Sequence, residues 1–550
     1  MSLRSRAALT AGWLAAWIGI AGVLPAESQS PGRPLLSLPA PAAGRDSTGT
    51  VIAVARPAPM TVQIEPHELG APIPPGFLGL AMEYPALAAY AGADPHAVNP
   101  VFVQLIHNLA AHPVLRIGGD STDWTWWPVP GRRRPPGVNF NLTRNWLATA
   151  KALAQATDAH LILGINLEAN SSTIASAEAR ALLSGIGRRR VHALEIGNEP
   201  DLYGVFPWNH TRAGRPIPGR PASYGFNKFS GEFTRVRRAL PPVSLAGPAS
   251  SDFSWLPDLP RFLASEPNVR EVTYHRYPLN RCIQTRSSAS YPTVPNLLTR
   301  DSTLRLMRVV APYIASAHRH GVSFRVDEMN GVTCGGVWGI SDTFASALWA
   351  LNAMYVVARS GANGVNIQTS PFPGTPNELF TFRHQAGRWL ASVRPEYYGL
   401  MMFADAAPPG SRFLQVTASS SGPVHSWATL TPNGQVHVVL INDSLKSARS
   451  VLVRPATPSA SAALQRLQAP SPYATHEITL AGHSFDSPSA TGALSGPSSI
   501  PVLKPAHGEY TVQVPAASAA VLTISLFATP TSKLSGWWPS GSTLQPHPEG

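Results

Sequence analysis

Short apolar runs of strand length alternate with longer amphipathic segments from about Phe77 to Gln368. In the longer segments the apolar residues recur at helical spacing. Eight short runs are predicted as strands: Phe77–Ala81, Val114–Gly118, His160–Leu167, Val191–Glu195, Val243–Ala246, Glu271–His275, Ser323–Asp327 and Gly364–Gln368. Six segments between them are predicted as helices: Val101–Ala111, Arg144–Thr157, Ile174–Leu183, Phe229–Leu240, Leu304–His320 and Thr343–Arg359. Eight such units over roughly 320 residues predict an α/β fold, a (β/α)8 barrel.

The pattern changes after about Asp405, where strands are no longer separated by helices. The predicted strands are Phe413–Ala418, Gln435–Ile441, Ser450–Val453, Glu477–Ala481, Thr511–Val514 and Ala520–Leu526. Turn signals such as Pro432-Asn433-Gly434 lie between them. This succession predicts a C-terminal β-sandwich domain. Thr61–Ile64 also alternates like a strand and precedes the barrel, so we expect it to join the sandwich.

The ends of the chain have the composition of segments outside these domains. Arg4 and Arg6 precede an apolar stretch from Ala7 to Leu24, with small residues near Ala26. This order predicts a signal peptide and a secreted or periplasmic protein, with a retained membrane anchor as the alternative. The predicted organisation is a signal peptide 1–26, a linker 27–58, a strand segment 59–75, a barrel 76–404, a sandwich 405–528 and a disordered tail 529–550.

Composition narrows the classes of partner. The formal net charge is +12, but the basic residues are spread along the chain, whereas nucleic-acid binding needs a clustered basic surface. An excess of this kind can also steer an acidic substrate such as a uronic acid sugar. Cys282 and Cys334 are the chain's two cysteines. With export they favour one disulfide between neighbouring loops, and they predict neither a metal nor a cofactor.

Two predicted barrel strands end in a glutamate. Strand four leads into Asn198-Glu199-Pro200, and strand seven leads into Asp327-Glu328. Active sites of this fold gather at the C-terminal ends of the strands, so we expect Glu199 and Glu328 to face each other there. Paired carboxylates cleave glycosidic bonds, and a separation of ~5–5.5 Å is typical of retaining enzymes. The pattern therefore predicts a retaining glycosidase.

These two segments resemble the clan A glycoside hydrolases. In that clan a glutamate that follows asparagine on strand four is the acid/base, and a glutamate on strand seven is the nucleophile. The resemblance implies that Glu199 is the acid/base and Glu328 the nucleophile. It also implies that Asn198 binds the 2-hydroxyl of the sugar.

Further motifs resemble glycoside hydrolase family 79, the β-glucuronidase and heparanase-like family. They are Phe77-Leu78-Gly79-Leu80-Ala81-Met82-Glu83-Tyr84, Leu115-Arg116-Ile117-Gly118-Gly119-Asp120-Ser121-Thr122-Asp123, Tyr274-His275-Arg276-Tyr277-Pro278-Leu279 and Gly339-Ile340-Ser341-Asp342-Thr343-Phe344. The similarity covers roughly residues 60–527. It implies a β-glucuronidase that acts on a carbohydrate substrate containing a uronic acid, and the predicted signal peptide makes this a secreted enzyme.

The family resemblance also supplies candidate substrate-binding residues. It places Glu83 and Asp120 or Asp123 by the sugar hydroxyls, and it places Tyr277 beside the nucleophile, whose pKa a hydrogen bond would keep low. His275 and Arg276, in the same motif as Tyr277, complete the candidate set.

The loop after strand eight departs from the family pattern. In the β-glucuronidases of family 79 this loop helps to recognise the uronate through a tyrosine. The sequence here reads Asn366-Ile367-Gln368-Thr369-Ser370-Pro371-Phe372, without that tyrosine. Arg276, Arg281 and backbone N–H groups are the expected substitutes.

Some neighbouring residues have simpler interpretations. Glu195 lies earlier on strand four and is expected to be a structural, paired carboxylate. Asp327 is adjacent to Glu328, so a regular strand would turn it toward the outside of the barrel. Four tryptophans are candidates for stacking on sugars or for simple packing: Trp124, Trp126, Trp127 and Trp338.

Three other functions remain open. A β-glucosidase or diglycosidase would use the same chemistry. Gly119-Asp120-Ser121 resembles the nucleophile segment of one esterase group, but the sequence has neither a late Asp-x-x-His partner nor a G-x-S-x-G elbow. A non-catalytic carbohydrate-binding protein is the third alternative, and the presence of both glutamates argues against it.

Overall fold

Eight parallel strands close into a barrel, as the alternation of apolar runs predicted. The computed structural model describes residues 58–372, 374–420, 422–457 and 459–525. The predicted signal peptide, the predicted tail and all of the predicted linker except residue 58 lie outside the described residues. The barrel strands are β2 (Leu78–Glu83), β3 (Val114–Gly118), β6 (His160–Ile165), β7 (Val191–Ile196), β10 (Leu245–Ser250), β11 (Val269–Arg276), β13 (Ser323–Met329) and β15 (Gly364–Gln368).

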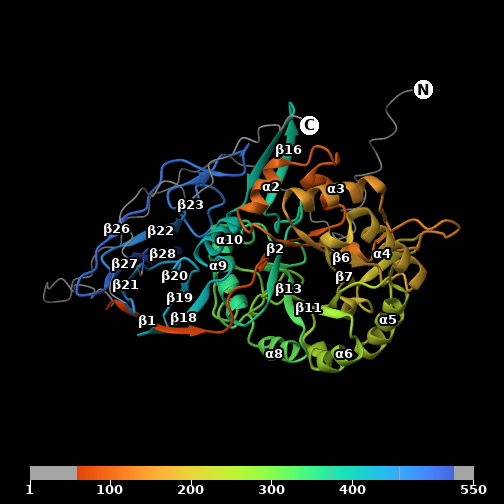
Figure 1. Cartoon of the computed structure of the whole chain (residues 1–550), viewed down its shortest axis with the longest axis horizontal. Coiled ribbons are helices and arrows are strands. Elements are labelled where there is room, and N and C mark those ends of the chain that lie inside the picture. Colours follow the sequence, from red (N-terminus) through yellow and green to blue (C-terminus); the bar gives the residue numbers. More distant parts are fainter. Residues whose placement is uncertain (1–57, 373, 421, 458, 526–550) are drawn as a thin grey trace, which may run out of the picture. The chain divides into compact units, whose positions relative to one another are not determined.

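Helices surround the barrel because all of them except α10, which follows the last barrel strand, lie in connections between parallel strands (Figure 1). They are α1 (Ala86–Ala91), α2 (Pro100–His107), α3 (Arg144–Ala156), α4 (Ser172–Ile186), α5 (Phe226–Ala239), α6 (Leu259–Ser265), α7 (Val294–Leu297), α8 (Ala311–Arg319), α9 (Phe344–Arg359) and α10 (Pro395–Ala406). One prediction was too long, because α8 begins at Ala311 and not at Leu304. Pro312 lies in its first turn, where the missing N–H costs no helical hydrogen bond.

Short 3-10 helices and two-stranded sheets lie outside the barrel and the large C-terminal sheet. These are η2 (Gly119–Thr122), η3 (Arg188–Arg190), η4 (Pro200–Leu202) and η5 (Phe253–Asp258), and the strand pairs β4 (Thr125–Trp126) with β5 (Phe140–Asn141), β8 (Pro207–His210) with β9 (Pro216–Pro218), β12 (Leu279–Asn280) with β14 (Val332–Thr333), β16 (Phe380–Gln385) with β17 (Arg388–Val393), and β24 (Ser484–Phe485) with β25 (Leu494–Ser495). The pair β12–β14 joins the loops that follow β11 and β13.

A ten-stranded sheet forms the C-terminal domain. Its strands are β1 (Met60–Leu69), β18 (Arg412–Ala418), β19 (Val424–Leu430), β20 (Gln435–Asn442), β21 (Arg449–Arg454), β22 (Ala462–Gln468), β23 (Thr479–Leu480), β26 (Val502–Leu503), β27 (Tyr510–Val514) and β28 (Ser518–Ser525). The predicted strand Thr61–Ile64 is part of β1, which lies between β18 and β21. The sequence patterns missed β19, β22 and the two-residue strand β26.

The sheet buries apolar residues on both faces. On β20, Val438 and Leu440 belong to the core inside the sandwich, whereas Val439 and Ile441 belong to the core shared with the barrel. This split follows from the two-residue period of a strand. Trp427 extends the shared core, since its ring stacks on Tyr355 of α9 at 5.6 Å between centroids.

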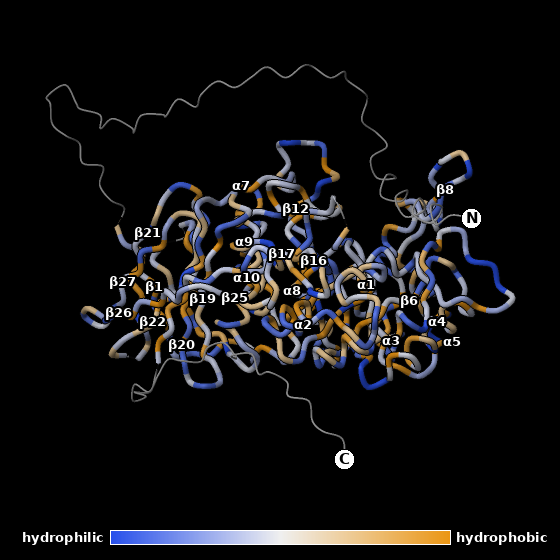
Figure 2. The backbone as a smooth tube through the Cα atoms, turned by 90° about the horizontal axis from the view of Figure 1, so that it is seen from above, coloured by the Kyte–Doolittle hydropathy of each residue, from blue (hydrophilic) through white to orange (hydrophobic). Residues whose placement is uncertain are grey.

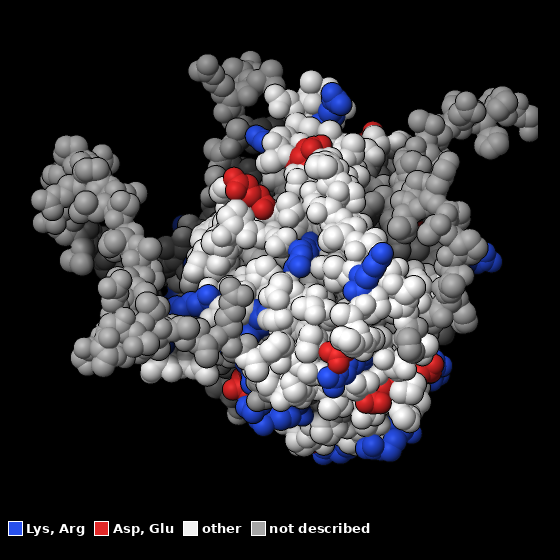
Figure 3. All heavy atoms as spheres, turned by 90° about the vertical axis from the view of Figure 1, so that its left-hand side faces the viewer, with Lys and Arg blue, Asp and Glu red and all other residues white. Residues whose placement is uncertain are grey.

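Polar residues lie mainly outside these cores. Figure 2 shows apolar segments concentrated in the barrel and its helices, with hydrophilic residues on the outlying loops. On the face in Figure 3, Lys and Arg are scattered and interspersed with Asp and Glu, as a dispersed basic excess predicts. In the part of the chain that the structure describes, no helix combines the length and apolarity needed to cross a bilayer.

Candidate active site

Glu199 follows the C-terminal end of β7 in a backbone conformation that turns the chain sharply. Its φ is 43°, in the left-handed region, and its N–H donates to the carbonyl of Ala249 in β10 at 2.8 Å. Pro200 then begins η4, a position where the missing N–H of proline costs no helical hydrogen bond. The Glu199 side chain keeps 19% of its surface exposed, so solvent and substrate can reach the carboxyl group.

Glu328 comes from β13, and a bulge aims it at the site. In the pairing with β11, Thr273 is opposite Arg325 and His275 is opposite Glu328, so β13 holds one extra residue. Such a bulge interrupts the alternation of side chains. The prediction that Asp327 faces outward is therefore wrong. Asp327 is fully buried in the barrel beside Glu328, and both carboxylates contact the same arginine.

That arginine is Arg116 on β3, and it connects four groups of the site. Its Nε donates to Glu195 at 2.7 Å and lies 2.9 Å from Asp327. One Nη donates to Glu328 at 2.6 Å, and the other donates to Asn198 at 2.8 Å. Arg116 has no exposed surface, so these contacts replace its hydration. The expectation that Glu195 is a structural, paired carboxylate is confirmed.

Sequence reasoning did not assign a role to Arg116, although a signal was present. Arg116 is a charged residue in the middle of an apolar barrel strand. A long charged side chain is rarely buried unless it is paired. The strand pattern therefore required acidic partners inside the barrel, and the structure supplies them from β7 and β13.

The surroundings of Glu328 favour its ionised form. Tyr277 donates a hydrogen bond to Glu328 at 2.8 Å, as the family resemblance implied. Burial by itself would raise the pKa of Glu328, but the charges of His275 and Arg116 and the hydrogen bond from Tyr277 hold that pKa below its ordinary value. A carboxylate that stays ionised is what a nucleophile requires.

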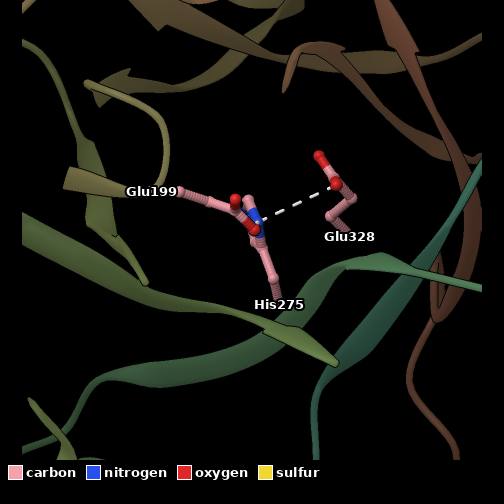
Figure 4. A group of neighbouring side chains, drawn as sticks. All are labelled: Glu199, His275 and Glu328. Atoms are coloured by element: carbon pink, nitrogen blue, oxygen red, sulfur yellow. Dashed lines mark hydrogen bonds and ion pairs between the residues drawn. The ribbon is translucent and has the colours of Figure 1, made fainter. Parts of the chain in front are cut away.

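His275 lies between the two glutamates. Figure 4 shows Glu199 and Glu328 reaching toward it from opposite sides. Its Nδ1 is 2.9 Å from Glu199 and 3.9 Å from Glu328. Burial by itself would lower the pKa of His275, but the carboxylates of Glu328 and Asp327 raise it to about 10. The neighbouring carboxylates therefore favour the charged form of the imidazole at neutral pH.

One atom each from Glu199, His275 and Glu328 lies within 4.8 Å of the others. This spacing alone would suit a metal ion. However, Arg116 is 2.6 Å from Glu328, and His275 carries a positive charge. Both charges oppose a divalent cation at this position. The close approach of two carboxylates is better explained by acid and nucleophile chemistry.

Asn198, Asp120 and Glu83 line the same region. Asn198 donates from Nδ2 to Asp120 at 3.3 Å, which links the strand-four motif to the strand-two motif. Glu83 accepts from the N–H of Ser121 at 2.8 Å, and burial together with Glu328 raises the pKa of Glu83 to about 7. A Cβ atom on Gly119 would lie 2.1 Å from Glu83, so glycine is required there.

Asp123, one of the two aspartates predicted near the sugar, accepts four hydrogen bonds within the protein. Its Oδ1 accepts from the N–H groups of Leu167 and Glu168, at 2.8 and 2.9 Å. Its Oδ2 accepts from the N–H of Asn198 at 3.1 Å and from the hydroxyl of Tyr203 at 2.6 Å. Asp123 is buried, so its carboxylate is occupied in joining three loops.

Arg276 is also directed elsewhere. Its Nε donates to the carbonyl of Leu306 at 3.0 Å, and Nη1 donates to the carbonyl of Tyr277 at 2.7 Å. The guanidinium lies 5.1 Å from the ring centroid of Phe253. These contacts hold the guanidinium against the protein backbone, and substrate binding by Arg276 stays a prediction. Arg281 likewise donates to the carbonyl of Gly336.

Two of the four candidate tryptophans differ in their exposure. Trp126 is buried with Val138 and Ile174, so its role is packing. Trp338 is 51% exposed and lies on the loop after β14, with the Arg394 guanidinium 5.6 Å from its ring. It remains a candidate for stacking on a sugar.

The esterase alternative finds no support at Ser121. Its hydroxyl donates to the carbonyl of Gly118 at 2.9 Å and accepts from the N–H of Tyr84 at 2.8 Å. A buried hydroxyl held in this way is not presented as a nucleophile. The predicted disulfide between Cys282 and Cys334 is present, and it joins the loops that follow β11 and β13.

Comparison with known proteins agrees with this geometry. Residues 426–521 match the glycosyl hydrolase family 79 C-terminal beta domain. The chain therefore carries a family 79 C-terminal β domain. The match confirms the resemblance to family 79, and with the barrel it identifies a glycoside hydrolase of the clan A fold. No curated protein sequence matches the chain.

Solved structures share the fold at low sequence identity. A 4-O-α-L-rhamnosyl-β-D-glucuronidase from Fusarium oxysporum 12S is 18% identical over 84% of this chain and 100% of that one, with a TM-score of 0.64. A GH51 arabinofuranosidase from Xanthomonas axonopodis pv. citri is 15% identical over 85% and 100%, with a TM-score of 0.60. A GH44 xyloglucanase from Paenibacillus polymyxa is 10% identical over 85% and 99%, with a TM-score of 0.55. At these sequence identities the three structures show a shared fold only.

Proposed function

We propose that this family 79 protein is a retaining β-glycosidase. The observation that carries the proposal is the short distance between Glu199 and Glu328. One carboxylate oxygen of Glu199 lies within 4.8 Å of one carboxylate oxygen of Glu328. Retaining glycosidases hold their carboxylates ~5–5.5 Å apart, whereas inverting enzymes leave ~6.5–9.5 Å for a water molecule. The short separation favours direct attack by one carboxylate on the sugar.

The proposed reaction has two steps. Glu328, held ionised by Arg116 and Tyr277, attacks the anomeric carbon while Glu199 donates its proton to the glycosidic oxygen. The carbon–oxygen bond to the aglycone breaks, and a glycosyl ester of Glu328 forms. Glu199 then removes a proton from water, which attacks the same carbon and releases Glu328. His275 holds Glu199 in position for both transfers.

The proposed substrate is a β-glucuronide. The family 79 domain and the likeness to a rhamnosyl-β-D-glucuronidase support this class. The net charge of +12 would favour the approach of an acidic sugar. A neutral β-glucoside is the second candidate, because Arg276 is bound to backbone carbonyls and the strand-eight loop lacks the tyrosine. The kcat/KM values for aryl β-glucuronide and aryl β-glucoside decide between the two.

We further propose that the protein is exported. The support is the order of Arg4, Arg6 and the apolar stretch from Ala7 to Leu24, together with the disulfide. Mass spectrometry of the protein recovered outside the cytoplasm should show a chain that begins near residue 27. A chain that keeps Met1 and stays with the membrane would instead support the retained anchor.

The catalytic assignment is tested at Glu328. Glu328→Gln should lower kcat by at least about 10³-fold, because a neutral amide cannot attack the sugar. Azide should restore turnover to Glu328→Ala and give the glycosyl azide with inverted configuration, which NMR of the product detects. Glu509→Ala, which removes a sandwich carboxylate paired with Arg454, is the control. Wild-type turnover by Glu328→Gln would contradict the proposal.

A further inference from the structure

Large apolar side chains are exposed on the loops next to the proposed acid. Val205 is 71% exposed and Phe206 is 38% exposed, on the segment that follows η4. Phe253 is 40% exposed at the start of η5, after β10. Adjacent exposed apolar residues mark binding surfaces more often than isolated ones do.

Hydrogen bonds join these two loops to each other and to Glu199. β7 and β10 are neighbours in the barrel, and the N–H of Glu199 binds the carbonyl of Ala249. Ser251, after β10, donates from its N–H and its hydroxyl to the carboxylate of Asp201, at 3.3 and 2.9 Å. Hydrogen bonds therefore tie the backbone that precedes each apolar segment to the loop that holds Glu199.

The turns after Glu199 are equally well defined. The N–H of Leu202 donates to the carbonyl of Glu199 at 2.8 Å. The N–H groups of Val205 and Phe206 both donate to the carbonyl of Leu202 at 2.9 Å. These consecutive turns connect Val205 to Glu199 through backbone hydrogen bonds. They restrict the motion of Val205 before any ligand binds.

Phe253 is held in place by aromatic and cationic contacts. The ring of Tyr274 lies 6.1 Å from its centroid, and the Arg276 guanidinium lies 5.1 Å from it. Arg276 is itself fixed by two backbone carbonyls. A ring ordered in advance costs little conformational entropy when a ligand packs against it.

The chemistry of the site determines which part of a substrate would meet this surface. An acid protonates the glycosidic oxygen, so the departing group lies on the side of the acid. We propose that Val205 and Phe253 form an aglycone-binding surface, and that the aglycone is an aromatic or other apolar group. The natural substrate class is then an aryl or similarly apolar β-glucuronide. This inference rests on the proposed function of Glu199.

The test compares two aglycones on one sugar. Val205→Ser/Phe253→Ser should lower kcat/KM for 2-naphthyl β-glucuronide by about tenfold, mainly through KM, because lost apolar contact weakens binding. The same variant should change kcat/KM for a β-glucuronosyl disaccharide by less than about twofold. Val502→Ser, at an apolar position 59% exposed on β26, is the matched control and should change neither value. A thermal melt shows that each variant is folded.

The outcomes separate this proposal from the proposed function. Equal losses on both substrates, a larger loss on the disaccharide, or no loss on the naphthyl substrate would overturn the aglycone assignment while glucuronidase activity stands. If the wild type hydrolyses glucosides and not glucuronides, the same two aglycones on glucose give the same test. A wild type that cleaves neither sugar overturns both proposals.

Discussion

At the scale of single residues, the site depends on how charges compensate one another inside the barrel. Arg116 and His275 form buried ion pairs with the carboxylates of Glu195, Asp327 and Glu328. Removing one partner of such a buried set leaves an uncompensated charge, which costs far more than a surface ion pair. The same charges keep the proposed nucleophile ionised.

Tyr277→Phe tests this control of ionisation. Tyr277 donates to the ionised form of Glu328, so its loss should let the pKa of Glu328 rise toward its ordinary value. At a given low pH less Glu328 is then ionised, and the acid limb of kcat/KM against pH should move to higher pH. A hydrogen bond to a charged group is worth roughly 1.5–3 kcal/mol, so kcat should fall by about tenfold or more.

The matched control for this substitution is Tyr510→Phe, on β27 of the C-terminal sheet, where the hydroxyl donates to the carbonyl of Ser459. It removes a hydrogen-bonded tyrosine hydroxyl outside the barrel and should leave the pH profile unchanged. An unchanged acid limb in Tyr277→Phe would show that the hydrogen bond does not set the ionisation of Glu328.

At the scale of elements, irregular backbone positions aim the side chains. The bulge in β13 brings Asp327 and Glu328 to the same side, and the left-handed residue after β7 presents Glu199. Each conformation costs energy locally. Asp123 and Arg116 hold the neighbouring loops and strands, so that the packed surroundings offset this cost.

The disulfide belongs to this scale, because it joins two rim loops. Cys282 and Cys334 are 52 residues apart in the chain, so the bond restricts the unfolded state considerably. Cys282→Ser/Cys334→Ser should lower the free energy of unfolding by roughly 2–4 kcal/mol. Thermal melts should show a lower Tm, and reduction of the wild type should produce the same change. An identical Tm for oxidised wild type and double variant would contradict this prediction.

At the scale of the whole molecule, barrel and sandwich share one core. Val439 and Ile441 of β20 pack in the same cluster as the barrel residues, and β1 enters the sandwich before the barrel begins. Trp427 adds a hydrogen bond from Nε1 to Asn352 of α9 at 2.9 Å. Two domains joined in this way should unfold together.

Trp427→Ala tests that coupling. Loss of the stacked ring and the hydrogen bond should lower the free energy of unfolding by about 3 kcal/mol. Calorimetry should show one transition at a lower temperature, with kcat/KM unchanged because the site is distant in the fold. Tyr473→Ala, at an aromatic position 53% exposed, should have little effect. Two separate transitions would show that the domains unfold independently.

The sequence by itself determined the eight barrel strands, the sandwich, the disulfide pair and the two glutamates. These features follow from local periodicity and from strand ends, which are properties of short segments. The same reasoning missed three strands of the sandwich, β19, β22 and β26.

The tertiary structure alone decided which polar residues reach the site. A one-residue bulge reversed the expected direction of Asp327. Loops distant in sequence form hydrogen bonds with Asp123 and Arg276. The role of Arg116 also became visible only when β3, β7 and β13 met inside the barrel. Register and the contacts between distant segments depend on the packing of the whole barrel, so a local pattern cannot encode them.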